Sequence, residues 1–266
     1  MSESEDPWER YATWWRETFT NGADLEYELQ ILPLAESHLE GARRVLDLGS
    51  GEGHLARRLA RGTAARSIVV GLEPSAAQLA GAVVQEAGAV AQQAGAVAQQ
   101  ADAGPRYVRG VGEHLPFRDG AFDGVVCCLV IEHASDPDAL LAEAVRVLAV
   151  GGRFVLLVNH PVFQGTGSGL VDDRILGEHY WRVGPYLRED FVVEEVDPGV
   201  RLRFAHRPLS RYVNPVTALG CVLTRLEEPE PPLAFLEGSV DLELESAIPR
   251  LLLLRFERLG AGHMGR

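Results

Sequence analysis

Five short apolar segments that alternate with helical segments constrain the fold more than any other feature of the chain. They lie at residues 43–49, 67–73, 106–110, 122–131 and 152–160. Their apolar residues run on without polar interruption, which is typical of strands buried on both faces. Strands of this kind that alternate with helices form a parallel sheet with helices on both sides. The sequence therefore predicts an α/β fold with a doubly wound sheet.

The helix before the last of these strands carries signals at both ends. Asp136 is placed to cap its N-terminus, and Pro137 suits the first turn, where no backbone donor is needed. Gly151 and Gly152 predict its end, because glycine commonly follows the last helical turn. We therefore expect this helix to run to Gly152 and the fifth strand to begin there.

Beyond residue 160 the alternation stops. Residues 161–190 contain Gly, His, Asp, Tyr and Trp without a regular period, and so long a connection is usually a lid or a binding loop. A hairpin, a helix and two more strands follow, at residues 191–204, 210–220, 221–229 and 249–259. We expect a seven-stranded, mostly parallel sheet built from residues 41–160 and completed by 206–266, with an N-terminal helical lid (1–40) and a lid and hairpin cap (161–205).

Four aromatic residues near the N-terminus share one helical face. Trp8, Tyr11, Trp14 and Trp15 fall at helical spacing, ahead of a turn predicted at Asn21-Gly22. One interpretation is a helix that packs this face on the core. The other is a lid over a ligand, because Trp and Tyr offer flat contact area.

A tandem repeat interrupts the core at residues 80–103. Ala80–Glu86 reads AGAVVQE, and two copies of AGAVAQQ follow up to Gln100. Ser75 and Gly104 bracket one long predicted helix, in which valine recurs every seven residues as in a narrow coiled-coil seam. The repeat is interpreted as solvated, because each internal glycine costs about 1 kcal/mol. The alternative is a self-association helix, which makes a homodimer an open expectation.

Charge and cysteine usage exclude several classes of protein. The net charge of −13 repels phosphate backbones and anionic lipid, which disfavours a nucleic-acid or membrane-surface partner. No apolar run approaches the about 18 residues of a membrane span, and the acidic N-terminus does not resemble a signal peptide. Three cysteines do not suit a disulfide framework, so we expect a cytoplasmic protein.

The segment VLDLGSGEG, residues 45–53, carries the strongest chemical signal. A strand ends at Asp47, three glycines alternate, and a helix begins, so that backbone can approach a ligand closely at the helix N-terminus. His54 stands where a dinucleotide fingerprint needs its third glycine, and a P-loop lysine is absent. Glu73, about 20 residues on, ends the second strand and is placed to accept both hydroxyls of a ribose.

Four segments in order resemble the signature motifs of class I S-adenosylmethionine-dependent methyltransferases, most closely the small-molecule group called type 11. They are VLDLGSGEG, GLEPS, GVGEHLPFRDGAFDGVVCCLVIEH and LLAEAVRVLAVGGRFVLLV, and they span Arg44 to Asn159. The resemblance implies a Rossmann-like fold, S-adenosyl-L-methionine as cofactor and S-adenosyl-L-homocysteine as product. Relatives often read GDAE where this chain has GVGE, so Val111 stands in the usual aspartate position.

The resemblance also implies roles for individual residues along the cofactor. It assigns the methionine end, the ribose, the adenine and the cofactor's amino group to successive motifs, with His133 on the rim. The implied cofactor-binding residues are Asp47, Gly49, Ser50, Gly51, Glu73, Pro74, Gln78, Gly112, Glu113, Leu129 and His133.

Candidate catalytic and acceptor residues follow from position and chemistry. His160 ends the fifth strand, where parallel sheets place their ligands, and an imidazole can take a proton near neutral pH. His179 is a second candidate base, with Trp15, Asp172, Tyr180 and Trp181 as candidate substrate contacts. Each of these also has a structural interpretation, such as a loop imidazole bonded to backbone. The spacing of His and Asp does not predict a metal site.

We therefore expect an S-adenosylmethionine-dependent methyltransferase that acts on a small organic molecule by in-line transfer. Oxygen is the expected acceptor atom, while nitrogen and carbon stay open. A binding or regulatory protein that keeps the cofactor pocket without turnover is the first alternative. A nicotinamide-dependent oxidoreductase is the second, and His54 counts against it.

Overall fold

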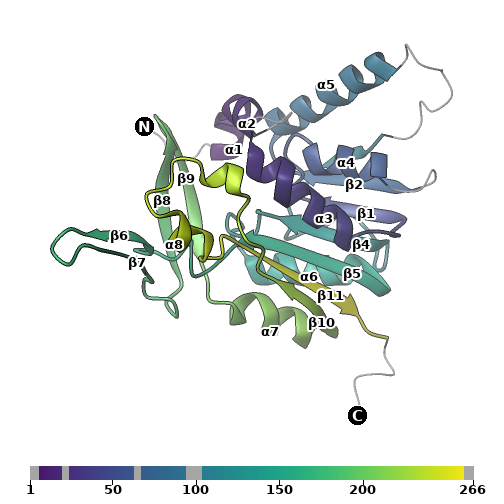
Figure 1. The fold of residues 1–266 in the computed structure, drawn as a ribbon. Coiled ribbons are helices and arrows are strands. Elements are labelled where there is room, and N and C mark those ends of the chain that lie inside the picture. The colour runs from purple at the N-terminus through teal and green to yellow at the C-terminus, as the bar shows by residue number, and fades with distance from the viewer. Residues whose placement is uncertain (1–5, 20–23, 63–66, 94–103, 261–266) are drawn as a thin grey trace.

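The centre of the structure, a computed structural model that describes residues 6–19, 24–62, 67–93 and 104–260, is a seven-stranded sheet (Figure 1). Its strands occur in the order β10-β11-β5-β4-β1-β2-β3. Their bounds are Arg44–Leu48 (β1), Ile68–Glu73 (β2), Arg106–Arg109 (β3), Phe122–Cys128 (β4), Leu148–Asn159 (β5), Cys221–Glu227 (β10) and Leu251–Arg258 (β11).

Strands β1 to β5 are parallel, and β11 is antiparallel to both of its neighbours, β5 and β10. This arrangement confirms the predicted Rossmann-like, mostly parallel sheet. The chain winds outward from β1 in both directions, through β2 and β3 on one side and β4 and β5 on the other. A doubly wound sheet binds ligands at such a reversal, outside the carboxyl ends of its central strands.

Helices cover both faces of the sheet (Figure 1). On one side lie α6 (Pro137–Val147) and α7 (Ser210–Ala218). On the other lie the π-helical turn η1 (Tyr27–Ile31), α3 (Leu32–His38) and α4 (His54–Gly62). Alternate residues of each strand serve the two faces, so Leu46 packs in the first cluster and Val45 in the second. Within the described residues, no helix is long and apolar enough to cross a bilayer.

The predicted start of α6 is confirmed and its predicted end is wrong. Asp136 accepts a hydrogen bond from the backbone N–H of Ala139 at 3.0 Å, and Pro137 opens the helix. The helix stops at Val147 rather than at Gly152, because Leu148 already pairs with Phe122 as the first residue of β5. Gly151, at φ 74°, therefore forms an irregularity at the start of the strand instead of a helix cap.

The segment after β5 forms two separate hairpins. The prediction of β8 (Asp190–Asp197) and β9 (Val200–His206) as a hairpin is confirmed. The expectation of irregular structure over 161–190 is wrong where β6 (Gly169–Asp173) pairs with β7 (Glu178–Arg182). The turn between them forms because Asp173 Oδ1 accepts from the N–H groups of Ile175 and Leu176. Figure 1 shows this hairpin projecting away from the main sheet.

The N-terminal segment contains α1 (Pro7–Arg10) and α2 (Ala12–Phe19). The predicted turn at Asn21-Gly22 lies outside the described residues. Helix α5 (Ala76–Gln93) contains the first two copies of the repeat, and residues 94–103 also lie outside the described part. Val83 and Val84, in the first repeat, are exposed. A short 3₁₀ turn η2 (Leu233–Leu236) and helix α8 (Leu242–Ser246) precede β11.

Candidate functional site

A cavity of about 340 Å³ lies at the carboxyl ends of β1, β2 and β4. Its floor is the turn after β1, its sides are the ends of β2 and β4 with the turn after β3, and its roof comes from α1, α2 and η1. The cavity thus occupies the reversal point of the sheet, where the fold predicts a ligand.

Two glycines in the turn after β1 stand where a side chain has no room. Gly49, Gly51 and Gly53 have φ values of 70°, 54° and 82°, which glycine adopts readily. A Cβ added at Gly49 would lie 2.5 Å from Cγ2 of Val130, and one at Gly53 would lie 2.1 Å from the Tyr107 hydroxyl. The turn needs glycine at both positions, where it presents backbone rather than a side chain.

Two buried carboxylates face each other across this turn. Glu73 accepts from the N–H of Gly51 at 3.0 Å and from the N–H of Ser75 at 2.9 Å. Asp47 is 2% exposed, and its Oδ2 has no hydrogen-bond partner among the described residues. Burial raises the pKa of each carboxyl to about 7, and for Asp47 the Glu73 carboxylate adds to the effect. Both groups would gain from a bound cation or hydroxyl donor.

The turn after β3 forms the next wall, through Val111, Gly112 and Glu113. Glu113 accepts from the Ser135 hydroxyl at 3.0 Å. Across from it, Pro74 and Gln78 also line the cavity, and Gln78 Oε1 is buried without a hydrogen-bond partner among the described residues. A ligand at this wall would meet a free amide oxygen and a carboxylate.

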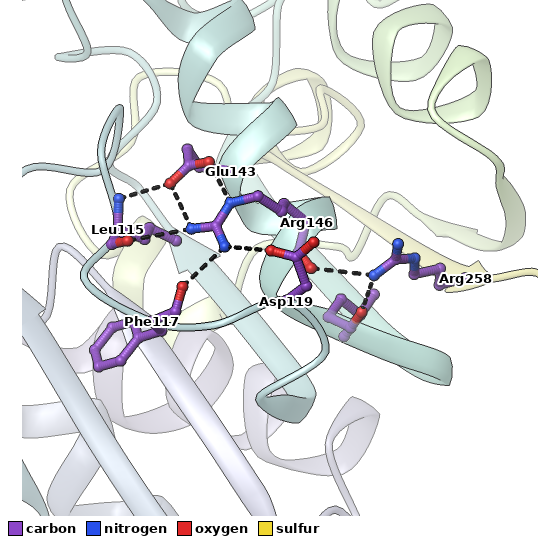
Figure 2. A network of polar contacts seen from close by, with 7 residues as sticks. Leu115, Phe117, Asp119, Glu143, Arg146 and Arg258 are labelled. Carbon is purple, nitrogen blue, oxygen red and sulfur yellow. Dashed lines mark hydrogen bonds and ion pairs between the residues drawn. The ribbon is translucent and has the colours of Figure 1, made fainter.

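Figure 2 shows how the chain beyond this wall is anchored. The Arg146 guanidinium donates to the carboxylates of Glu143 and Asp119 and to the carbonyls of Leu115 and Phe117, over 2.6–3.1 Å. These contacts fix residues 115–119 on the end of α6. The Arg258 side chain binds the Arg146 carbonyl at 3.1 Å and so ties the same corner to β11.

The end of β4 carries the one non-glycine residue with positive φ among those described. Leu129, at φ 54°, lines the cavity, and its N–H donates to the Leu157 carbonyl at 2.8 Å. Such a conformation costs a non-glycine residue about 1–3 kcal/mol and is found most often at functional sites. The turn that follows places His133 on the cavity wall.

An aromatic row, defined as His54, Tyr27, Trp15, Trp8, His133 and Phe204, crosses the site. Successive ring centroids lie 6.5, 6.1, 5.2, 4.8 and 4.9 Å apart. Phe19 stacks on Trp15 at 4.4 Å. The first five rings of the row and Phe19 line the cavity. The predicted aromatic face therefore divides, since Trp8 and Trp15 face the cavity while Tyr11 and Trp14 do not line it.

Polar contacts hold the roof in place on two sides. Glu9 accepts from the Ser75 hydroxyl at 2.7 Å, at the start of α5. On the other side, Trp14 Nε1 donates to Asp197 at 2.7 Å and the Tyr11 hydroxyl donates to the Gly199 carbonyl at 3.2 Å. Both acceptors lie at the tip of the β8–β9 hairpin, so the hairpin supports the N-terminal helices that cover the cavity.

All the residues assigned to the cofactor from the sequence line this one cavity, and so does Trp15. The structure does not bring His160 there. Its Nε2 lies 2.9 Å from Glu228, and its Nδ1 accepts from the N–H of Val162 at 3.1 Å. Both nitrogens are therefore engaged in a buried structural contact, and the expectation of a base at His160 is corrected.

The other lid candidates also lie away from the cavity. His179 Nδ1 is 3.1 Å from Asp241, which caps α8, and its Nε2 is 3.6 Å from Asp172. Trp181 stacks on Phe163, and Tyr180 is exposed. His179, Asp172, Tyr180 and Trp181 are thus corrected as site residues, because the β6–β7 hairpin packs beside α8 instead of folding over the sheet. Within the described residues, no group of three His, Cys, Asp or Glu could hold a metal ion.

Among the ring side chains of the cavity wall, sequence reasoning did not assign Phe19, Tyr27 and His54 to the site. Phe19 continues the helical spacing of Trp15 by four residues, which is a usable signal. Tyr27 stacks on His54 at 6.5 Å although they come from separate elements, and only the packing of η1 against α4 brings them together.

The family model and the two relatives that match this chain most usefully are all described as methyltransferases. A family model described as a methyltransferase domain matches residues 46–156. A demethylmenaquinone methyltransferase of Thermus thermophilus is 34% identical over 167 residues, which cover 62% of this chain and 66% of the relative. An uncharacterized methyltransferase of Mycobacterium sp. (strain JLS) is 37% identical over 131 residues, or 48% and 43% of the two chains. The matched part is thus less than two thirds of the length of these relatives.

A solved structure extends the likeness over most of the chain. The S-adenosylmethionine dependent methyltransferase from Mesorhizobium loti superposes with a TM-score of 0.64 at 25% identity. The superposition covers 85% of this chain and 96% of the other.

Proposed function

Because the chain belongs to the class I S-adenosylmethionine-dependent methyltransferases, carrying their methyltransferase domain at residues 46–156, we propose that it methylates an oxygen atom of a small organic molecule. S-adenosylmethionine is the methyl donor and S-adenosylhomocysteine the product. When bound, the donor supplies an electrophilic methyl group on a positively charged sulfur.

The observation that carries this proposal is the set of unpartnered polar atoms around the cavity. Asp47 Oδ2, Ser50 Oγ and Gln78 Oε1 are buried without a hydrogen-bond partner among the described residues. Buried polar atoms are rarely left unpaired in the absence of a ligand. The donor's ammonium would suit Asp47, its ribose hydroxyls would suit Glu73, and its adenine would lie between Gln78 and the turn at Gly112. The residues present therefore fit the cofactor.

The partly covered cavity supports a small acceptor. The roof of α1, α2 and η1 covers part of the site with aromatic side chains. The net charge of −13 further disfavours a nucleic acid. Desolvation and orientation under such a roof are the main means by which this chain would promote an in-line displacement.

Calorimetric titration with S-adenosylmethionine, S-adenosylhomocysteine and NADH tests the proposal. Binding of the two sulfur ligands at micromolar concentration, without binding of NADH, is the expected result. Failure of both sulfur ligands to bind would overturn it. A protein that binds both but transfers no methyl group to any of a broad set of alcohols and phenols would fit a binding or regulatory role instead.

A further inference from the structure

The cavity wall carries several carboxylates and few groups that could balance their negative charge. Asp6, Asp47, Glu52, Glu73 and Glu113 line it, whereas no arginine of the described residues does, and the chain contains no lysine. Glu52 is neutralised by Arg57 at 2.6 Å, from outside the lining. A carboxylate or phosphate group on the acceptor would therefore enter the cavity without a positive partner, which is costly in a buried site.

Flat aromatic surface makes up the roof. Trp15 stacks with Phe19, and Tyr27 lies parallel to His54 with an angle of 8° between the rings. Trp8 stands edge-on to both Trp15 and His133. Rings favour contact with other rings in stacked and edge-on arrangements. The shape and chemistry of this wall suit a planar aromatic molecule.

His133 has one nitrogen fixed and one free. Its Nδ1 lies 2.8 Å from the Arg203 carbonyl, which can only accept, so Nδ1 carries the hydrogen. Nε2 then holds a lone pair, and it has no hydrogen-bond partner among the residues that the structure describes. Burial lowers the pKa of His133 to about 4, so the imidazole stays neutral at physiological pH. The ring is clamped between Trp8 and Phe204, which fixes its orientation.

His54 offers the only comparable imidazole on the described cavity wall. Its Nε2 lies 3.2 Å from Glu28, which leaves Nδ1 without a partner. That Nδ1 atom is buried, whereas Nε2 of His133 is not among the buried unpartnered atoms. Of the two imidazoles, His133 therefore offers the free nitrogen with less cover from the protein, and we assign the contact with an entering hydroxyl to it.

We propose that the acceptor is a planar aromatic molecule without negative charge, held under Trp15, Phe19 and Tyr27, whose hydroxyl donates to Nε2 of His133. This rests on the proposed function and names the acceptor class and the proton acceptor. In the transfer, the acceptor oxygen bonds to the methyl carbon while the bond from that carbon to sulfur breaks. The electron pair of the broken bond stays on sulfur, and the hydroxyl proton moves to Nε2 of His133. The positive charge of the sulfonium is thereby transferred to an imidazolium, which releases its proton to water because of its low pKa.

Equilibrium dialysis with three matched probes tests this class on the whole protein saturated with S-adenosylhomocysteine at pH 7.5. The probes are 2-naphthol, 2-naphthoate, which carries a carboxylate in place of the hydroxyl group, and naphthalene. We expect 2-naphthol to bind at least about tenfold more tightly than 2-naphthoate, because the anion lacks a partner in the cavity. It should bind about fivefold more tightly than naphthalene through the hydrogen bond to His133.

Three variants locate the site. His133→Phe keeps a ring between Trp8 and Phe204 and should abolish the preference for 2-naphthol over naphthalene. Trp15→Ala should weaken 2-naphthol binding about tenfold. Trp181→Ala is the matched control, because Trp181 is also a tryptophan but stacks on Phe163 and does not line the cavity. It should change binding by less than about threefold.

The outcomes separate this inference from the proposed function. If S-adenosylhomocysteine itself does not bind, the proposed function fails. If it binds, the inference is overturned when 2-naphthoate binds as tightly as 2-naphthol. It is also overturned if His133→Phe retains the preference for the hydroxyl, or if His54→Phe alone removes it.

Discussion

Replacing Glu73 with glutamine should separate the carboxylate's part in ligand binding from its part in the fold. Both of its oxygens accept backbone hydrogen bonds, from Gly51 and from Ser75. Glutamine has one oxygen and one NH₂ group, so it can accept only one of these bonds. It also lacks the negatively charged carboxylate that would accept hydrogen bonds from two ribose hydroxyls. A hydrogen bond to a charged group contributes about 1.5–3 kcal/mol, so the variant should lose about 2–3 kcal/mol of binding free energy.

That loss corresponds to a dissociation constant for S-adenosylhomocysteine raised about 30- to 150-fold. The substitution has two opposing effects on the stability of the fold. The pKa of Glu73 is raised from 4.5 to about 7 by burial, so its ionisation at pH 8 costs the folded state about 3 kcal/mol. Glutamine removes this cost and forfeits one backbone hydrogen bond. The free energy of unfolding of the ligand-free variant should thus fall by no more than about 2 kcal/mol.

Calorimetry at pH 8 measures the first quantity and urea unfolding the second. Glu228→Gln serves as the control, because Glu228 contacts His160 outside the cavity, and its affinity for S-adenosylhomocysteine should match the parent protein. An affinity of Glu73→Gln within threefold of the parent would refute the ribose role. Weaker binding accompanied by an equal loss of stability would also refute the reasoning, since the effect would then be on the fold.

Three further predictions concern pH, the corner of Figure 2 and the repeat. Because Asp47 and Glu73 have pKa values of about 7 when folded and lower values when unfolded, the ligand-free protein should lose stability as pH rises from about 4 to 7. A cationic ligand needs both carboxylates ionised, so affinity for S-adenosylmethionine should rise about 10- to 100-fold from pH 6 to pH 8, and a flat calorimetric profile would contradict this. Arg146→Met removes the guanidinium contacts drawn in Figure 2 and should lower the free energy of unfolding by about 2–3 kcal/mol in urea titrations. The same change at Arg174, whose side chain is 89% exposed, should cost less than about 0.5 kcal/mol. Deletion of residues 87–93, one repeat, should leave the affinity for S-adenosylhomocysteine unchanged. The oligomeric state, measured by analytical ultracentrifugation, should also be unchanged. A shift from dimer to monomer would support the self-association alternative.

The parts of the fold that could be predicted from the sequence are those set by residues close together in the chain. The strand, glycine turn and helix from Val45 onward use short-range rules, and so does the cap at Asp136. Glu73 could be placed because a parallel sheet brings the ends of neighbouring strands together. The residues assigned to the cofactor accordingly line one cavity.

The acceptor side depends on contacts between distant segments. His160 ends β5 as predicted, but its orientation is set by Glu228, which is 68 residues away in sequence. A lid was expected both from residues 1–40 and from residues 161–190, and only the N-terminal segment lines the cavity. The long loop offered suitable residue types, but the β6–β7 hairpin packs beside α8, where His179 contacts Asp241, the cap of that helix.

The position of β11 has a consequence for how the protein is made. This strand, residues 251–258, is inserted between β5 and β10 rather than added at an edge. During synthesis the sheet cannot close until this strand has left the ribosome, and until then β5 and β10 both present unpaired backbone. Exposed strand edges promote aggregation, and pairing over so long a sequence separation is slow. Chaperone dependence and sensitivity to C-terminal truncation should accordingly concentrate on this one strand, and not on the hairpins or the repeat.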